Sequence, residues 1–153
     1  MDLLKLVALD AEDLAVLSAH LQDAVVRVSD IIWLPAEQRL VIALNRFDWV
    51  GAKCTSTPTC RRRRAALRFE RVQAFKARGI EPKDTNAVLN LLAADFEEAE
   101  PPSGSVILAF SGGAALRLDV ECIEAELVDL GPEWTATRCP DHLEVSGEGA
   151  LPA

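Results

Sequence analysis

The sequence lacks the long apolar runs, the glycine or proline bias and the basic leader that mark several protein classes. No window approaches eighteen uninterrupted apolar residues, so we expect no membrane-spanning helix. Residues 1–10 have no basic start and are interrupted by acids, unlike a secretory signal. The chain has eight glycines and eight prolines, and half of its 153 residues are hydrophobic. This composition excludes collagen-like and low-complexity chains. We expect a cytoplasmic protein with one domain at 1–134 and a flexible tail at 135–153.

Cysteine and histidine are scarce, which limits metal and thiol chemistry. The chain has four cysteines and two histidines, and without a secretory signal we expect reduced thiols. Cys54, Cys60, Cys139 and His142 could together bind zinc. Five residues separate the first two cysteines, however, outside the usual spacing of about two to four. We therefore expect no metal and no cofactor, with this set as the alternative.

No catalytic motif is recognisable. Ser111-Gly112-Gly113 lacks the earlier glycine of a nucleophile elbow, and no Lys-Ser or Lys-Thr pair follows it as in a phosphate-binding loop. The acidic residues at 97–100 and 119–124 are typical of a solvated surface, although such groups can also bind a cation or act as acid and base. We expect no catalytic residue, and whether the protein is an enzyme stays open.

Charge is distributed unevenly along the chain. The net charge is −8, which argues against general binding to nucleic acid or to anionic membranes. Residues 61–78 hold eight cations and one acid, a local charge of +7, so the other 135 residues carry −15. The cations of this basic segment are Arg61, Arg62, Arg63, Arg64, Arg68, Arg71, Lys76 and Arg78.

Hydrophobic spacing predicts an α+β fold, mostly antiparallel sheet with one N-terminal amphipathic helix. Leu14, Leu17 and Leu21 recur at helical spacing after the potential N-cap Asp10, which predicts a helix at 11–22. Strands are predicted at 3–9, 25–34, 39–49 and 88–96, and a hairpin at 104–118 turns at its Gly-Gly pair. Residues 70–78 and 119–130 fit either a strand or a helix, and at 70–78 we slightly favour a bulged strand.

A short internal repeat indicates two related β-units. Ala65-Ala66-Leu67-Arg68-Phe69 matches Ala114-Ala115-Leu116-Arg117-Leu118. Residues 24–80 and 85–130 would then be two copies of one unit, although five common residue types can also coincide by chance. A true repeat predicts a pseudo-symmetric antiparallel core with the helix packed on one face.

The arginines of the basic segment are candidate binding residues. On a strand, Arg62, Arg64 and Arg68 share one face, opposite the apolar side chains between them. Guanidinium groups in such a row could bind RNA, an anionic metabolite or an acidic protein surface. The alternative is that they pair with the acids of the same chain or protect a sheet edge from aggregation.

A second candidate lies where a predicted strand ends. Arg46, Asp48 and Trp49 gather hydrogen-bonding groups there, and Arg and Trp are common anchors of protein interfaces. An ordinary half-buried strand shows the same alternation of polar and aromatic residues.

Three stretches resemble the bacterial, chiefly alphaproteobacterial, domain-of-unknown-function family 2948. They are residues 4–25, Leu44-Asn45-Arg46-Phe47-Asp48-Trp49, and residues 118–125. The resemblance covers roughly residues 3–134 and implies a single-domain cytosolic protein, with no activity, cofactor or catalytic residue to carry over. It also suggests an association with histidine biosynthesis genes.

These observations lead to three functional hypotheses. The first is a non-enzymatic protein-binding or assembly module that uses the basic segment on an acidic body, with a protein partner or a second copy of the chain. The second is an RNA- or anionic-ligand-binding module that uses the same arginines, with nucleic acid disfavoured because no aromatic side chain lies among them on the polar face. The third is a small enzyme associated with histidine biosynthesis.

Overall fold

The computed structural model describes residues 3–47, 60–130 and 134–136. Helix α1 spans Ala11–Leu21, which confirms the predicted helix. It begins where Asp10 caps it: the Asp13 amide donates to Asp10 Oδ1 over 2.8 Å. Leu14, Leu17 and Leu21 are fully buried, so the apolar stripe of the helix faces the core. No described helix is long and apolar enough to cross a lipid bilayer.

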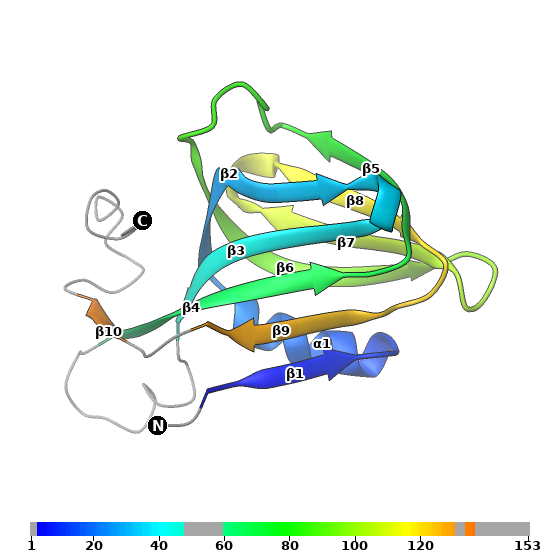
Figure 1. The fold of residues 1–153 in the computed structure, drawn as a ribbon, viewed down its shortest axis with the longest axis horizontal. Helices are drawn as coiled ribbons and strands as arrows, with labels where there is room; N and C mark the ends of the chain where they lie inside the picture. Colours follow the sequence, from blue (N-terminus) through cyan, green and yellow to red (C-terminus); the bar gives the residue numbers. More distant parts are fainter. Residues whose placement is uncertain (1–2, 48–59, 131–133, 137–153) are drawn as a thin grey trace.

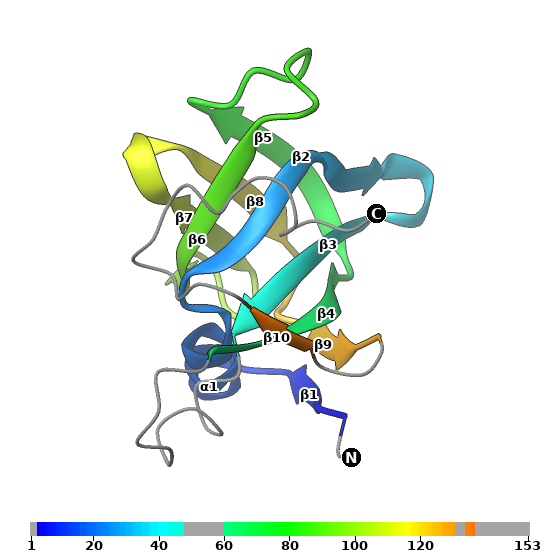
Figure 2. The ribbon, with the colours of Figure 1, turned by 90° about the vertical axis from the view of Figure 1, so that its left-hand side faces the viewer.

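Ten strands form one antiparallel sheet in the described part of the chain. The order is β1-β9-β4-β3-β2-β6-β7-β8-β5, and β10 also pairs with β4. The sheet curls until its two halves face each other, with α1 at one end (Figures 1 and 2). The fold is therefore α+β and mostly antiparallel, as predicted. The strands are β1 Lys5–Ala8, β2 Ala24–Leu34, β3 Arg39–Phe47, β4 Cys60–Phe69, β5 Val72–Arg78, β6 Val88–Glu98, β7 Gly104–Phe110, β8 Ala115–Val120, β9 Ala125–Asp129 and β10 Trp134–Ala136.

Strand pairing has the symmetry that the sequence repeat predicts. Strands β2, β3 and β4 lie side by side, as do β6, β7 and β8, and β2 pairs with β6 where the two units meet. The fourth strand of each unit crosses to the other unit, because β5 pairs with β8 and β9 pairs with β4. Leu67 and Leu116, equivalent in the repeat, are both buried. Each unit therefore supplies the strand that pairs with the third strand of the other unit.

The two ambiguous segments are strands that follow sharp corners. Arg71 has φ 58° between β4 and β5, and the pairing of β5 with β8 shifts register between Val72 and Ala74, as a bulged strand requires. At the equivalent corner the chain leaves β8 and enters β9. Two backbone hydrogen bonds join the corners: the Glu70 amide donates to the Glu124 carbonyl, and the Glu121 amide donates to the Arg71 carbonyl.

The predicted hairpin at 104–118 is also confirmed. Strands β7 and β8 pair around the Gly-Gly turn, where Gly112 and Gly113 have φ of 77° and 83°. Beyond β9, β10 extends two residues past the expected domain boundary at 134 and pairs with the start of β4.

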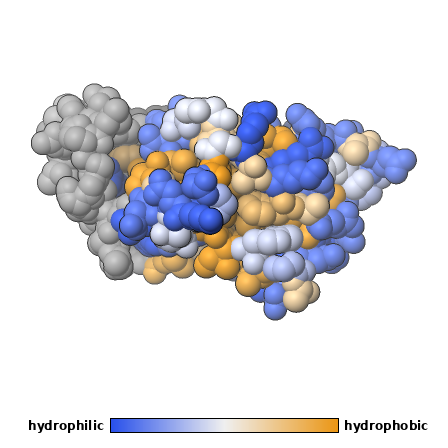
Figure 3. Space-filling model, turned by 90° about the horizontal axis from the view of Figure 1, so that it is seen from above, coloured by the Kyte–Doolittle hydropathy of each residue, from blue (hydrophilic) through white to orange (hydrophobic). Residues whose placement is uncertain are grey.

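The hydrophobic core fills the space between the two halves of the sheet. Core positions alternate along each strand, as Leu40, Ile42 and Leu44 do on β3. The Trp33 and Phe75 rings, from β2 and β5, pack with centroids 5.6 Å apart and close the gap between these strands. Seen from the side of β2 and β5, hydrophobic residues form a band across the molecule between hydrophilic ones (Figure 3).

Candidate functional site

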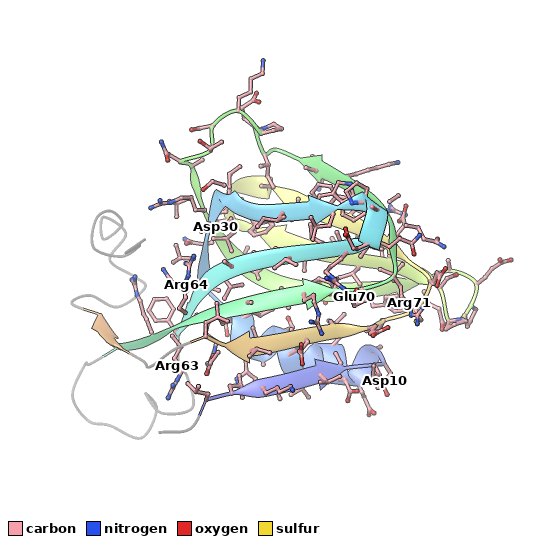
Figure 4. All side chains as sticks on the ribbon, in the orientation of Figure 1. Asp10, Asp30, Arg63, Arg64, Glu70 and Arg71 are labelled. Atoms are coloured by element: carbon pink, nitrogen blue, oxygen red, sulfur yellow. The ribbon has the colours of Figure 1, made fainter. Side chains whose placement is uncertain are left out.

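The arginines of β4 lie on both faces of the sheet. Arg63 follows the parity of Leu67 and Phe69, which face the core, whereas Arg62 and Arg64 follow the outward parity. Figure 4 shows Arg63 and Arg64 on opposite sides of the strand. The arginine run therefore contributes to two different environments.

The inward environment is a buried ion pair at the end of the core. Arg46 Nε and Nη2 donate to the two oxygens of Asp129 over 2.9 Å each, and Arg63 Nε lies 3.7 Å from Asp129 Oδ2. The Leu4 amide donates to the same carboxylate over 2.8 Å. Burial alone would raise the pKa of Asp129, but the hydrogen bonds from Arg46 and Leu4 and the charges of both arginines lower it below its ordinary value. Asp129 is therefore a buried carboxylate that stays ionised.

The outward environment begins with Arg62. The residue is 3% exposed, and its guanidinium carbon lies 4.9 Å from the centre of the Phe47 ring, a cation–π contact. Burial lowers the pKa of Arg62. Its Nε has no hydrogen-bond acceptor among the residues that the structure describes.

The other outward arginines are neutralised by carboxylates of the same chain. Arg64 donates to Asn45 Oδ1 and to Asp30 Oδ2, over 3.2 and 3.3 Å. Arg68 bridges Glu70 and Glu126 at 3.0 and 2.7 Å. These contacts correspond to the alternative in which the arginines pair within the fold.

Arginines at the corner between β4 and β5 also form ion pairs with acids of the same chain. Arg39 makes two hydrogen bonds to Glu70, at 2.8 and 3.1 Å, so that carboxylate is shared with Arg68. Arg71 contacts Glu124 at 3.0 Å and Glu121 at 3.6 Å. Arg64, Arg68 and Arg71 of the basic segment are therefore all paired with acids of the same chain.

The cations at the C-terminal end of the basic segment differ from the paired arginines that precede them, because no described acid is paired with them. Lys76 and Arg78 on β5 are exposed and make no ion pair with the residues described. Together with Arg117 of β8, which is the register partner of Lys76, they line a hollow of about 430 Å³. Ala77, Ile107 and Ala115 also line it, and Glu97 completes the lining. Three cations thus surround a shallow depression with an apolar lining.

Arg117 in this hollow has a neighbouring acid. Its Nε donates to Asp119 Oδ1 over 3.2 Å, and Ser105 Oγ donates to the same oxygen over 2.7 Å. The hydrogen bond from Ser105, together with the nearby cations Arg117 and Lys76, lowers the pKa of Asp119 below its ordinary value, although partial burial opposes this. The hollow itself keeps a net positive lining, because Glu97 is the one acid among the described residues that line it.

Sequence reasoning missed Arg117 as a partner of the basic segment. It lies 41 positions beyond Lys76 in the printed sequence, and only the crossing of β5 to the second unit brings the two residues together. The sequence repeat was the available signal, because it indicates that the two units contact each other.

Several candidate residues lie outside the described part of the chain. These are Asp48, Trp49, Cys54, Cys139 and His142, while Cys60 begins β4. Among the described residues, no three histidine, cysteine or acidic side chains are grouped so that they could hold a metal ion. Cys122 is a half-buried free thiol.

Fold and site together define a protein whose described part is built on a single antiparallel sheet, with an arginine-rich interior strand, β4, and a basic hollow at the β5 edge. The chain belongs to the family described as "Protein of unknown function (DUF2948)", whose profile matches residues 4–142. Searches of curated proteins and of solved structures found no match.

Proposed function

We propose that the protein is a non-enzymatic binding module that takes an acidic segment of a partner protein against the outer face of β5 and β8. The observation that carries this proposal is the hollow lined by Lys76, Arg78 and Arg117, of which the first two have no ion pair among the described residues. The contact surface thus lies at the end of the basic segment, because Arg64, Arg68 and Arg71 are already engaged within the chain.

Charge complementarity supports an acidic partner. The hollow presents cations on a chain whose net charge is −8, so an anionic segment meets attraction there rather than repulsion. Exposed charges of this kind govern association rate and salt dependence more than final affinity. We therefore expect binding that weakens clearly between low and physiological salt.

A protein segment fits the lining better than single-stranded RNA does. The hollow is lined by aliphatic residues such as Ile107 and Ala115, and none of the side chains that line it in the described part of the chain is aromatic. Base stacking on aromatic rings supplies much of the affinity of modules that bind single strands. Aliphatic side chains of a peptide can pack on this surface while its carboxylates reach the cations.

The test measures binding of a fluorescent peptide of alternating glutamate and leucine by anisotropy. Charge reversal by Lys76→Glu with Arg78→Glu should weaken binding at least tenfold. Lys83→Glu, an exposed cation in the loop after β5, is the matched control and should leave affinity within about twofold. Equal affinities of the two variants, or tighter binding of an oligouridine probe than of the peptide, would overturn the proposal.

Self-association is tested in the same series. Sedimentation velocity of the full chain at increasing concentration shows whether a second copy supplies the acidic segment. A dimer that Lys76→Glu with Arg78→Glu dissociates, and Lys83→Glu does not, would identify the partner as another copy. A dimer that survives both variants would show that assembly uses a different surface.

A further inference from the structure

Arg62 is an unusual side chain because it is a buried cation with no carboxylate partner among the described residues. Only 3% of the residue is exposed, and it lies on the outward face of β4 beside its register partner Phe47. The Phe47 ring supports one face of the guanidinium, at 4.9 Å. A ring face partly compensates a buried charge, but it offers no acceptor to the N–H edge of the guanidinium.

Two acids among the described residues bind the arginines next to Arg62 in the register of β3 and β4. On the inward face, Arg46 holds Asp129 through two hydrogen bonds. On the outward face, Arg64 holds Asp30. Arg62 Nε has no hydrogen-bond partner within the described ranges, so neither of these carboxylates binds it.

We propose that Arg62 is the anchor of a small-anion site, in which a carboxylate or phosphate group accepts hydrogen bonds from the guanidinium edge while Phe47 supports its face. A guanidinium binds such oxyanions with two parallel N–H···O bonds, which a single carboxylate or phosphate group can accept. Desolvation by the surrounding protein strengthens these bonds relative to a surface site. The site is separate from the basic hollow on β5 and β8 and does not depend on the function proposed for it.

The direct test follows the Nε–Hε signal of Arg62 by ¹⁵N NMR in the full-length protein, assigned with the Arg62→Lys variant. Acetate and inorganic phosphate are titrated separately at constant ionic strength. We expect a saturable shift of the Arg62 signal with at least one of them, and a smaller, non-saturating change at Arg64. A signal that stays unchanged up to 100-fold molar excess of both anions would overturn the proposal.

A second measurement does not depend on the variant folding well. An anion that binds only the folded chain raises its melting temperature, by about 2–8 °C at saturating concentration for a protein of this size. Wild type should show this rise with the anion that shifts the NMR signal, and Arg62→Gln should lose it. A rise of equal size in Arg62→Gln would mean that the anion binds elsewhere.

The anion could instead come from the same chain, because Asp48 follows Phe47 directly in the sequence. The titration is therefore repeated with Asp48→Asn. Equal saturation in wild type and Asp48→Asn supports a site for an external anion. A response seen only in Asp48→Asn would show that the chain fills its own site, and the proposal would then be wrong.

Discussion

Replacing Asp129 by asparagine removes the charge at the centre of the buried ion pair and leaves two arginines without their shared counter-ion. The carboxylate is fully buried and accepts two hydrogen bonds from Arg46 and one from the Leu4 amide. Loss of one partner of a buried ion pair costs about 3–5 kcal/mol, because the remaining charge is left uncompensated. Domains of this kind are stable by only about 5–15 kcal/mol, so Asp129→Asn should remove a large part of the free energy of unfolding.

Urea unfolding followed by circular dichroism measures this loss. The midpoint should fall by about 1 M or more, with an unchanged slope if the transition stays two-state. Glu98→Gln, which removes an exposed carboxylate at the end of β6, is the control and should change stability by less than about 0.5 kcal/mol. A loss below about 1 kcal/mol in Asp129→Asn would refute the assignment of this pair as a buried, mutually dependent unit.

The same pair predicts a pH dependence with a definite sign. Because the pKa of Asp129 is lower in the folded chain than in the unfolded one, its charge stabilises the fold above the unfolded pKa. That contribution disappears as pH falls through the folded pKa. The stability difference between wild type and Asp129→Asn should therefore be largest near pH 7 and shrink below about pH 4. A difference that stays constant down to about pH 3 would contradict this account.

Two further substitutions test local features of the fold. Asp10→Ala removes the N-cap of α1 and should cost about 1 kcal/mol in urea unfolding, whereas Asp10→Ser should restore most of the loss. Gly104→Ala places a methyl group against the Glu97 carbonyl and 2.5 Å from Phe96 Cζ, so it should cost about 1–3 kcal/mol and lower the melting temperature. A Gly104→Ala protein as stable as wild type would show that β6 and β7 can separate without penalty.

Local pattern was enough to predict the helix and most strands. Asp10 and the leucines of α1 specify a capped amphipathic helix, and alternation specifies the long strands, because both signals come from neighbouring residues. At Arg71 the alternation slips, and sequence alone left a helix open there. The positive φ of that residue and its hydrogen bond to the second corner resolve the slip as a turn between two strands.

The charged site was less predictable, for two physical reasons. In a run of four arginines, alternation gives no contrast between buried and exposed positions, so the burial of Arg62 and Arg63 left no signal. Ion pairs such as Arg46 with Asp129 join residues 83 positions apart and depend on the strand order. The repeat was the one sequence feature that carried long-range information.

The exchange of fourth strands between the two units affects how the chain can fold while it is being synthesised. While the ribosome is still producing the second unit, β5 has emerged but its neighbour β8 has not, and β4 still lacks β9. In the nascent first half, the apolar faces and free edges of these strands therefore stay exposed until β9, which ends at Asp129, has left the exit tunnel. Unpaired strands in that state are prone to aggregation. The first half of the chain therefore cannot complete its backbone hydrogen bonding before the second half has been synthesised.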